Sequence, residues 1–370
     1  MHNIRKIFIG TSVHSCTDNR IFHKEAVSLA KHFDVELHAP ADFEQKHLKN
    51  VTIFGLPQWQ KESDRKAIRI ELWHRLQQSN ADIFIFHDPE LIWIGIKAAV
   101  IQGIRVVYDM HENTVASIKR KKWLGPFSKL FAIAGYTLLQ WISKRTFSHY
   151  LLAEHSYQKF IKNNATVVLN YPIVKDCSKD KDSIYDLVYL GDVTEDRGCI
   201  LIIGVLNKLI SDFADIKLAI IGKIEKNANE LIKDKIEKFG LDKHVTLFGY
   251  IDYPEAMKIV CKSKLGLCLL KPIPNYIHSY PTKLFDYMQA GVPFVCSNFP
   301  LYIELIDECD AGVTVDPLDL NAATKEISRL LTDSNLYDKM SQNGIDALNS
   351  KFNWTSEEEK LIAVMKSILT

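Results

Sequence analysis

The segment from Asn275 to Glu304 decides the fold class and reads NYIHSYPTKLFDYMQAGVPFVCSNFPLYIE. It predicts a loop that ends in a helix cap at Thr282, a helix over 283–290, a terminating glycine at Gly291 and a strand over 293–297. A helix that leads directly into an apolar strand is the repeating unit of an α/β fold.

The start of this helix also predicts an anion-binding site. Unpaired backbone N–H groups around Thr282 to Leu284 attract negative charge, and Lys283 adds a mobile positive charge. Asp286 lies one turn later and can accept hydrogen bonds from sugar hydroxyls. The alternative is an ordinary α/β unit whose lysine is solvated.

Apolar strands alternate with helical patterns along the whole chain. Such continuous apolar runs are typical of parallel sheets that helices cover on both faces. The predicted strands cover residues 6–10, 35–38, 83–87, 106–109 and 150–153, and then 186–190, 217–221, 245–248, 265–270, 294–296 and 312–315. They predict the α/β class, with two Rossmann-like, doubly wound parallel-sheet domains.

The polar segment over 170–183 has the composition of a linker. We therefore predict an N-terminal domain over 1–169 and a C-terminal domain over 184–352. The pattern over 353–370 predicts a final amphipathic helix. Ligands of open α/β sheets bind at the carboxyl ends of the strands, so we expect the site in a cleft between the facing domains.

The composition excludes several classes of protein. The 370 residues carry a formal net charge of +1, with 47% hydrophobic and 25% charged residues, so nothing indicates a nucleic-acid partner. The seven cysteines are scattered, odd in number and without a C-x-x-C pair, which predicts reduced thiols and a cytosolic protein. The N-terminus lacks a signal-peptide pattern, and no apolar run reaches the ~20 residues that span a bilayer.

A second anion site is predicted where the C-terminal domain begins, in the sequence YLGDVTEDRGCIL. Gly191 forms a turn after a strand, Thr194 is a candidate cap, and Arg197 lies in the first turn of the next helix. A guanidinium group can bind two oxygens of a diphosphate at once. Gly222 and Lys223 follow the next strand and allow a backbone approach to a nucleotide. The alternative for Arg197 is a side chain that faces solvent.

Polar clusters follow three strands of the first domain. Histidines and carboxylates at three strand ends converge where a site is expected. These residues are His14, Asp18 and Arg20, then His87 and Asp88, and then Asp109, His111 and Glu112. By spacing alone, His87 and His111 can also be read as metal ligands, but no dense ligand triad accompanies them, and we predict no metal site.

The motif PTKLFDYMQAGVPFV resembles the donor-binding signature of the retaining glycosyltransferases of family 4, which have the two-domain GT-B fold. That family normally shows E-x7-E here. In this chain Asp286 stands at the second glutamate and His278 at the first. The resemblance implies that Asp286 binds the ribose of a nucleotide and that His278 lies beside the transferred sugar.

The resemblance extends over nearly the whole chain. The SVHxxxDxRIFHKEA, HDPEL and YDxHE motifs are similar to one subgroup of the family, the bacterial envelope polysaccharide enzymes. The second domain is similar to the family pattern G-R-x5-K-G, with Asp192 where an arginine is common and Arg197 where a lysine is common. FGYIDYPEAMKIV, over 248–260, resembles the segment beside the base.

The resemblance implies a retaining hexosyltransferase that moves a sugar from a nucleoside diphosphate sugar to an acceptor hydroxyl, without a cofactor or tightly bound metal. We predict His111, Arg197 and Lys283 as catalytic. Donor-binding residues are predicted to be Gly191, Arg197, Gly222, Lys223, His278, Thr282, Lys283, Leu284 and Asp286. Acceptor-side residues are predicted to be His14, Asp18, Arg20, His87 and Asp88. The last helix is expected to cross back to the first domain.

Two other functions stay open. A sugar-nucleotide epimerase of the same fold binds the same donor and turns over without an acceptor. The departures at His278 and Asp192 also fit a noncatalytic scaffold that binds nucleotide sugars. The expected partners are in each case a nucleotide sugar and, for a transferase, a glycan or lipid-linked glycan of an envelope polysaccharide such as capsule or O-antigen.

The segment over 119–145 is basic, aromatic and apolar, and no acidic residue occurs between Glu112 and Glu154. A helix pair of this composition is typical of a segment that lies on an anionic bilayer. We therefore expect a cytoplasmic protein that contacts the inner face of the cytoplasmic membrane. The alternative is a pair of helices with buried apolar faces and solvated lysines.

Overall fold

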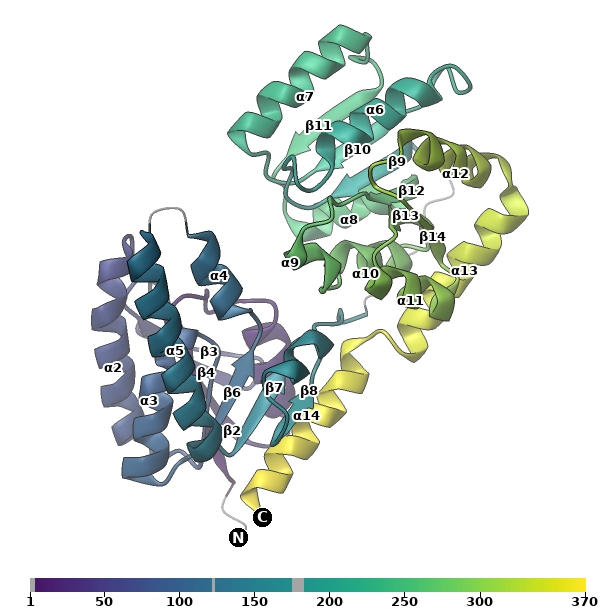
Figure 1. The fold of residues 1–370 in the computed structure, drawn as a ribbon. Helices are drawn as coiled ribbons and strands as arrows, with labels where there is room; N and C mark the ends of the chain where they lie inside the picture. The colour runs from purple at the N-terminus through teal and green to yellow at the C-terminus, as the bar shows by residue number, and fades with distance from the viewer. Residues whose placement is uncertain (1–3, 122–123, 175–182) are drawn as a thin grey trace. The chain divides into compact units, whose positions relative to one another are not determined.

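The computed structural model describes residues 4–121, 124–174 and 183–370. The chain forms two compact units (Figure 1). The first unit is Met1–Asn170 together with Trp354–Thr370, and the second is Tyr171–Asn353. Each unit is a layered α/β structure built on one sheet.

The first unit is built on one eight-stranded sheet with the order β3-β4-β2-β1-β5-β6-β7-β8. Neighbouring strands are parallel except β3 and β4. The strands are β1 (Lys6–Gly10), β2 (Asp34–Pro40), β3 (Gln45–Leu48), β4 (Val51–Leu56), β5 (Ile83–Phe86), β6 (Arg105–Met110), β7 (His149–Leu152) and β8 (Ala165–Val167). The main helices are η1 (Ile21–Ala26), α1 (Val27–Leu29), α2 (Arg65–Gln78), α3 (Ile92–Lys97), η4 (Ala98–Gln102), α4 (Thr114–Arg120), α5 (Pro126–Thr146) and α14 (Trp354–Leu369).

The central strand β1 explains why this sheet is buried on both faces. Ile7, Phe8 and Ile9 are all fully buried. Phe8 packs into the core on the side of α2, α3 and α5, whereas Ile7 and Ile9 pack into the core on the side of η1 and α14. Because alternate side chains of a strand point to opposite faces, a continuous apolar run fits a sheet with helices on both sides.

The hairpin of β3 and β4 was not predicted. β3 is polar and exposed, and β4 alternates buried and half-buried residues, so neither segment is a continuous apolar run. Lys49 and Asn50 both adopt positive φ angles, of 50° and 63°, as the two central residues of a tight hairpin turn do. The short strand β8 was also missed.

The second unit contains a six-stranded sheet with the order β11-β10-β9-β12-β13-β14, and every neighbouring pair is parallel. The strands are β9 (Tyr185–Leu190), β10 (Leu218–Ile221), β11 (Val245–Gly249), β12 (Ser263–Cys268), β13 (Phe294–Ser297) and β14 (Gly312–Val315). The helices are α6 (Cys199–Leu209), α7 (Lys226–Phe239), α8 (Tyr253–Cys261), α9 (Pro274–Ile277), α10 (Thr282–Gln289), α11 (Pro300–Cys309), α12 (Leu320–Thr332) and α13 (Ser334–Ser350).

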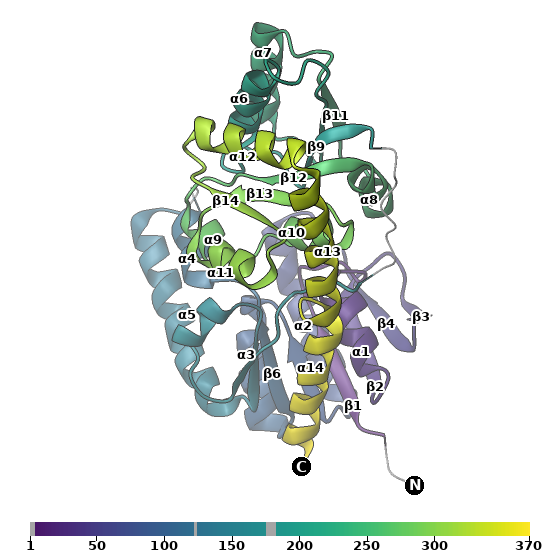
Figure 2. The same ribbon diagram turned by 90° about the vertical axis from the view of Figure 1, so that its right-hand side faces the viewer.

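The last helix, α14, packs on the first unit (Figure 2). The indole N–H of Trp354 donates a hydrogen bond to the Ser28 hydroxyl at 2.8 Å, and the Glu357 carboxylate accepts one from the backbone N–H of Leu169 at 2.9 Å. Leu361 and Met365 are fully buried in the core beside η1. The amphipathic pattern of the sequence thus places its apolar side against the first sheet.

Part of the predicted linker, residues 175–182, lies outside the described residues. The expectation that every cysteine is a reduced thiol is wrong for Cys261, which is disulfide-bonded; Cys177 lies outside the described residues. The free thiols are Cys16, Cys199, Cys268, Cys296 and Cys309. Among the described helices, none combines the length and the hydropathy needed to cross a bilayer.

Candidate functional site

Helix α10 begins at Thr282, which corrects the prediction of a cap at this residue. Its N-cap is Pro281, with no side-chain hydrogen bond, and Thr282 is the first residue of the helix. The backbone N–H of Leu284 donates to the carbonyl oxygen of Pro281 at 3.1 Å, so this amide is already paired and is not the free donor that was predicted. The Leu284 side chain lies in the core.

Lys283 is buried, with 5% of its surface exposed. Its ammonium lies 3.6 Å from the centre of the Tyr189 ring and makes no hydrogen bond to any described residue. Burial lowers the pKa of Lys283 to about 8. Burying an ammonium group without a hydrogen-bond acceptor costs free energy. The position of Lys283 therefore indicates a site in which a bound anion supplies the missing acceptor.

The second cation of the site is Arg197, and both cations meet at Gly191. Gly191 follows β9 with φ 115°, and a Cβ atom built on it would lie 3.5 Å from Lys283 Nζ and 3.6 Å from Arg197 Nη1. The absence of a side chain at Gly191 leaves the space between the two cations open. The structure therefore brings together the arginine and the lysine that the two sequence motifs predicted separately.

The prediction that Arg197 lies in the first turn of a helix is wrong. Helix α6 begins at Cys199, and Gly198 is its N-cap with φ 82°. Thr194 caps a turn before the helix, because its hydroxyl accepts the backbone N–H of Arg197 at 3.3 Å. The exposed carboxylate of Asp192 lies 3.8 Å from Arg197 Nη2.

Gly222 and Lys223 have different surroundings. Gly222 has φ 141°, and a Cβ atom on it would lie 2.0 Å from the carbonyl oxygen of Gly191. Only glycine therefore allows the loops after β9 and β10 to approach so closely. The Lys223 carbonyl oxygen accepts a hydrogen bond from the backbone N–H of Val193, which holds the same two loops together.

Asp286 lies on the same helix as Lys283, with 8% of its surface exposed. Its Oδ1 accepts a hydrogen bond from the Tyr253 hydroxyl at 2.7 Å. Tyr253 was not predicted as a site residue, although it belongs to the segment that resembles the base-binding region. His278 follows directly after α9 as its C-terminal cap residue.

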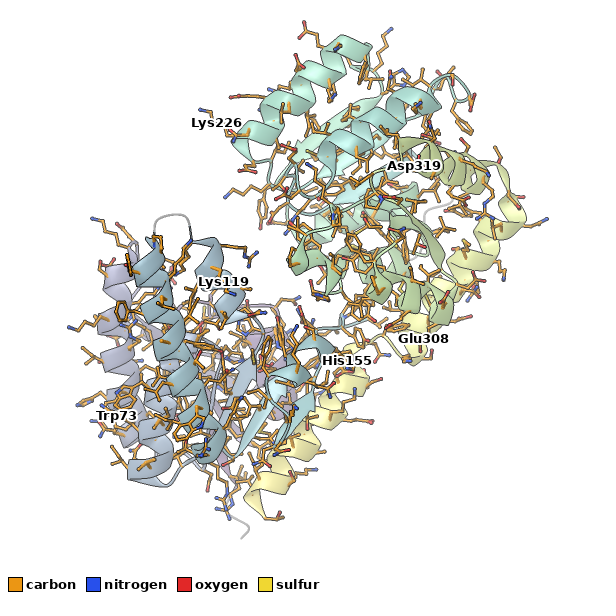
Figure 3. All side chains as sticks on the ribbon, in the orientation of Figure 1. Trp73, Lys119, His155, Lys226, Glu308 and Asp319 are labelled. Atoms are coloured by element: carbon orange, nitrogen blue, oxygen red, sulfur yellow. The ribbon has the colours of Figure 1, made fainter. Side chains whose placement is uncertain are left out.

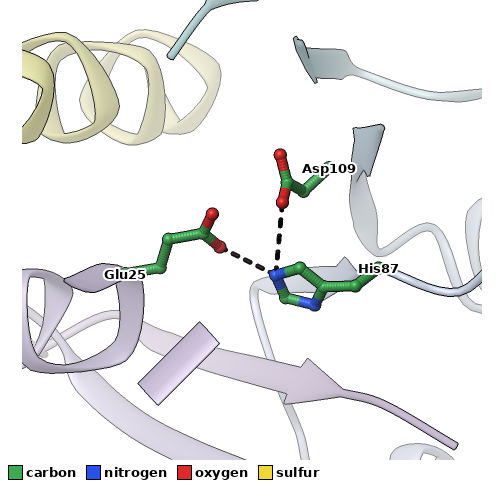
Figure 4. A group of neighbouring side chains, drawn as sticks. All are labelled: Glu25, His87 and Asp109. Carbon is green, nitrogen blue, oxygen red and sulfur yellow. Dashed lines mark hydrogen bonds and ion pairs between the residues drawn. The ribbon is translucent and has the colours of Figure 1, made fainter. Parts of the chain in front are cut away.

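In the first unit, a buried network joins the strand ends (Figure 4). Arg20 binds Asp109 with two hydrogen bonds of 2.7 Å, from Nε and Nη2, and its Nε lies 3.0 Å from Glu25 Oε1. His87 Nε2 lies 2.8 Å from Glu25 Oε2 and 3.6 Å from Asp109 Oδ2. Arg20 and His87 are 6% and 0% exposed, so these two predicted acceptor-side residues are enclosed and do not face an acceptor directly.

Electrostatics make this network one of paired charges. Burial opposes charge on each member and, with the charge of Asp109, raises the pKa of Glu25. Glu25 and Asp109 raise the pKa of His87 in spite of burial, and Arg20 lowers the pKa of Asp109. Glu25, His87 and Asp109 bring one ligand atom each within 4.8 Å of the others, a spacing that a metal ion can use. Arg20 contacts both carboxylates and already supplies positive charge there, so the geometry favours an ion-pair network over a metal site.

Beside this network, His14 and His111 lie nearer the surface. His14 Nδ1 is 3.5 Å from Asp18, and its Nε2 is 3.4 Å from Asp88. The His14 ring contacts the His111 ring edge-on at 5.0 Å. Burial lowers the pKa of His111 to about 4, so His111 is neutral at pH 7 and can accept or donate a hydrogen bond.

The loop after β1 is held by Asp88. Its Oδ2 accepts hydrogen bonds from the Thr11 hydroxyl at 2.8 Å and from the Ser12 backbone N–H at 2.6 Å. Glu154 lies two residues after β7 and was not predicted as a site residue; burial raises its pKa to about 7. Its position directly after the predicted strand over 150–153 was the available signal.

A cavity of about 750 Å³ lies beside α8 in the second unit. It is lined by Ile184, Tyr185, Phe248, Tyr250, Ile251, Asp252, Glu255, Lys258, Ile259 and Lys262. Neither Lys283 nor Arg197 lines it, so it is separate from the place where the two cations meet.

Comparison with known proteins agrees with this picture. Residues 176–347 match the family described as glycosyl transferases group 1. A stretch of 150 residues is 23% identical to the sucrose synthase of Melioribacter roseus. That match covers 38% of this chain and only 18% of the sucrose synthase. The family match therefore lies within the second unit, which is the predicted donor-binding domain.

Solved structures establish the fold of the whole chain. Sucrose-phosphate synthase from Thermosynechococcus elongatus superimposes with a TM-score of 0.74 at 12% identity, over 99% of each chain. Anabaena HepE in complex with UDP gives 0.73 at 13% identity, over 98% of this chain and 100% of HepE. WaaG, a glycosyltransferase involved in lipopolysaccharide biosynthesis, gives 0.67 at 14% identity, over 97% and 99%. The chain thus has the predicted GT-B fold.

Proposed function

We propose that this protein is a glycosyltransferase that moves a hexosyl group from a nucleoside diphosphate sugar to an acceptor hydroxyl. The observation that carries the proposal is the meeting of Lys283 Nζ and Arg197 Nη1 over Gly191, with the lysine buried and lacking a hydrogen-bond acceptor among the described residues. A diphosphate supplies the negative charge that this arrangement lacks. The match of residues 176–347 to glycosyl transferases group 1 supports the same conclusion.

The two cations act on the leaving group. As the bond between the sugar and the diphosphate breaks, negative charge grows on the phosphate oxygens. Lys283 and Arg197 stabilise it, and each charge-assisted contact contributes ~1.5 to 3 kcal/mol. We propose retention of the anomeric configuration, with the acceptor attacking the same face and its proton passing to the leaving phosphate oxygen. Neutral His111 contributes a hydrogen bond near the reacting sugar.

The donor is proposed to carry a uridine base. The HepE structures hold UDP and UDP-glucose, and these neighbours have the same fold as this chain. Asp286, with its carboxylate oriented by Tyr253, suits the hydroxyls of the ribose. His278 replaces the glutamate that the family usually places near the transferred sugar, and we assign it to that subsite.

For the acceptor, we propose a lipid-linked or growing envelope polysaccharide at the inner face of the cytoplasmic membrane. Support comes from the motifs shared with the envelope polysaccharide subgroup and from the likeness to WaaG. His14, Asp18 and Asp88 form a polar cluster after the strands β1 and β5 that can orient acceptor hydroxyls.

A binding and turnover experiment tests this function. Calorimetry with UDP and GDP measures the affinity of the diphosphate site, and release of UDP from UDP-sugars is followed with and without glycan acceptors. UDP release that requires an acceptor is the expected result. Conversion of the sugar without an acceptor would instead identify an epimerase, and tight UDP binding without any turnover would identify a scaffold.

Lys283→Met tests the diphosphate site, and Lys226→Met at an exposed position of α7 is its matched control (Figure 3). Lys283→Met is expected to weaken UDP binding about tenfold or more, through the loss of one charged contact. Lys226→Met leaves the affinity unchanged. Equal affinities of both variants would remove Lys283 from the proposed diphosphate site.

A further inference from the structure

The solvent face of α5 is unusual for a helix of a globular protein. Five large apolar side chains on this helix are each more than half exposed. They are Phe127, Leu130, Phe131, Leu138 and Trp141, which we name the α5 apolar face. Their spacing of three, one, seven and three residues places them along one side of the helix.

The opposite side of α5 faces the core of the first unit. Tyr136 and Ser143 are buried there, and Leu139 and Ile142 pack against the same core. An ordinary surface helix buries its apolar stripe and exposes polar residues. Here the core accounts for one apolar side of α5, while a second apolar side remains in solvent. The alternative that buried helix faces explain the composition therefore fails for these five residues.

Positive charge surrounds this face. Residues 91–108 and 113–153 contain no aspartate or glutamate. Lys144 and Arg145 lie in the last turn of α5, and Lys119 and Arg120 lie in the last turn of α4. Figure 3 shows Lys119 at the end of α4 that lies near α5. The surface thus combines exposed apolar area with unopposed positive charge.

Two contacts link the charges to the helix. Lys129 Nζ donates to the carbonyl oxygen of Lys119 at 2.8 Å, which joins the two helices. The guanidinium of Arg145 lies 3.8 Å from the centre of the Trp141 ring. A tryptophan beside an arginine suits the boundary between lipid head groups and acyl chains, because the indole ring is amphipathic and the guanidinium group binds phosphate.

Helix α3 packs against α5 (Figure 1), and α3 and η4, which follows it, expose three further large apolar side chains, Trp93, Val100 and Ile101. A partner that covers the α5 apolar face and its basic surroundings must be apolar and negatively charged at its rim.

We infer that the α5 apolar face docks on an anionic lipid bilayer, with the helix lying along the surface and its apolar side chains entering the acyl boundary. Apolar burial and attraction between lysines and anionic head groups add together in such a contact. The surface lies in the first unit and uses none of the residues assigned to the donor. Its test therefore needs no sugar nucleotide and is independent of the proposed chemistry.

Flotation of the full-length protein with vesicles tests the inference. Vesicles of phosphatidylcholine alone are compared with vesicles that also contain phosphatidylglycerol. We expect recovery with the anionic vesicles only, with a decrease at high salt because screening weakens the charged contacts. Equal recovery with both kinds of vesicle, or none with either, would overturn the inference.

Variants identify the surface that binds. The double change Phe127→Ser and Phe131→Ser is expected to lower the partition coefficient about tenfold or more through the loss of two apolar anchors. Lys144→Glu is expected to lower it about fivefold or more. The matched control is Leu318→Ser, a similarly exposed apolar residue of the second unit, which leaves the partition unchanged.

A second copy of the chain is the competing occupant of this face. Light scattering after gel filtration over a range of concentrations measures it. A dimer that the double serine variant dissociates, in a protein that does not float with vesicles, would assign the face to self-association and overturn the lipid contact. Unchanged thermal unfolding of the variants shows that the effects come from the surface and not from a loss of folding.

Discussion

The ammonium of Lys283 lies 3.6 Å from the centre of the Tyr189 ring, and no described residue accepts a hydrogen bond from it. The ring offsets part of the cost of burial, since a cation is attracted to the face of an aromatic ring. A diphosphate bound as we propose would offset the rest of this cost. The buried charge of Lys283 therefore lowers the stability of the free protein, although the proposed function requires it.

Lys283→Met is expected to raise the free energy of unfolding at pH 7 by about 1 to 3 kcal/mol, because methionine fills the space without a buried charge. The same change removes the proposed contact with the diphosphate. Urea denaturation measures the stability, with Lys226→Met as the control. A loss of stability in Lys283→Met would show that the lysine is a structural residue and that its ammonium is not held in readiness for a ligand.

The pKa of Lys283 gives a second prediction. Burial lowers it from 10.5 to about 8, so the folded chain releases this proton at a lower pH than the unfolded chain. The unfolded state binds more protons between these values, and stability due to this group rises as the pH increases from about 8 to 10.5. The stability advantage of Lys283→Met should therefore shrink over this range.

The affinity of the wild-type protein for UDP should follow the protonated lysine. We expect it to fall as the pH is raised above the pKa of about 8, whereas the affinity of Lys283→Met changes little. Calorimetry at several pH values measures both. Parallel curves for the two proteins would mean that another group controls the pH dependence of binding.

The two cations show how far the sequence predicts the site. Each lies next to a glycine turn or a helix start that follows an apolar strand, and the rule for strand ends in parallel sheets predicts that such positions converge. Tyr189 and Tyr253 carried no comparable signal, because an aromatic residue in a strand or a helix is ordinarily a core residue. Their roles depend on packing between elements that the sequence does not encode locally.

The strands, too, were predicted only where their sequence carries a strong local pattern. Strands with continuous apolar runs, such as β1 and β9, were predicted close to their observed bounds, because burial on both faces leaves a strong local pattern. The hairpin of β3 and β4 lies at a sheet edge, where the residues of β3 are exposed. The network of Arg20, Glu25, His87 and Asp109 includes hydrogen bonds between residues that are 62 and 89 positions apart, so only the folded chain shows which charges are paired.

Tyr253→Phe tests the proposed ribose contact. The change removes the hydroxyl that donates to Asp286 at 2.7 Å and leaves the ring in place. We expect KM for the nucleotide sugar to rise about threefold to tenfold with little change in kcat, since one hydrogen bond that orients the carboxylate is lost.

A donor with a deoxyribose provides the control for Tyr253→Phe. The wild-type enzyme and the variant should differ much less with this donor, because it lacks the hydroxyl that we propose Asp286 binds. An effect of the same size with both donors would place the role of Tyr253 in the packing of α8 and not in ribose recognition.

Asp192→Asn is expected to tighten UDP binding about twofold to fivefold. The exposed Asp192 carboxylate lies 3.8 Å from Arg197 and would compete with the proposed diphosphate for the guanidinium group. An exposed pair of this kind is weak, so the gain is small. Calorimetry at low and high salt measures the change, which should shrink as the salt concentration increases. Weaker binding by Asp192→Asn would show that the carboxylate positions Arg197 and does not compete for it.

His87→Gln tests the buried network through the pH dependence of folding. Burial acts to lower the pKa of His87, but Glu25 and Asp109 outweigh it and raise this pKa above the 6.5 of an ordinary histidine. The protonated histidine therefore stabilises the fold below pH 6.5, and this contribution is lost as the pH rises through the raised value. We expect His87→Gln to cost about 3 to 5 kcal/mol at pH 6 and less at high pH, because the loss of His87 leaves two buried carboxyl groups with the single positive charge of Arg20.

Urea denaturation of the wild type and of His87→Gln between about pH 5.5 and 8.5 measures this effect. The free energy of unfolding of the wild type should decline relative to that of the variant across the upper part of the range. His74→Gln, at a histidine of α2 that takes no part in this network, serves as the control and should run parallel to the wild type. If the free energy of unfolding of His87→Gln had the same pH dependence as that of the wild type, His87 would be neutral in the folded protein. Arg20 would then be the cation that balances the two carboxylates.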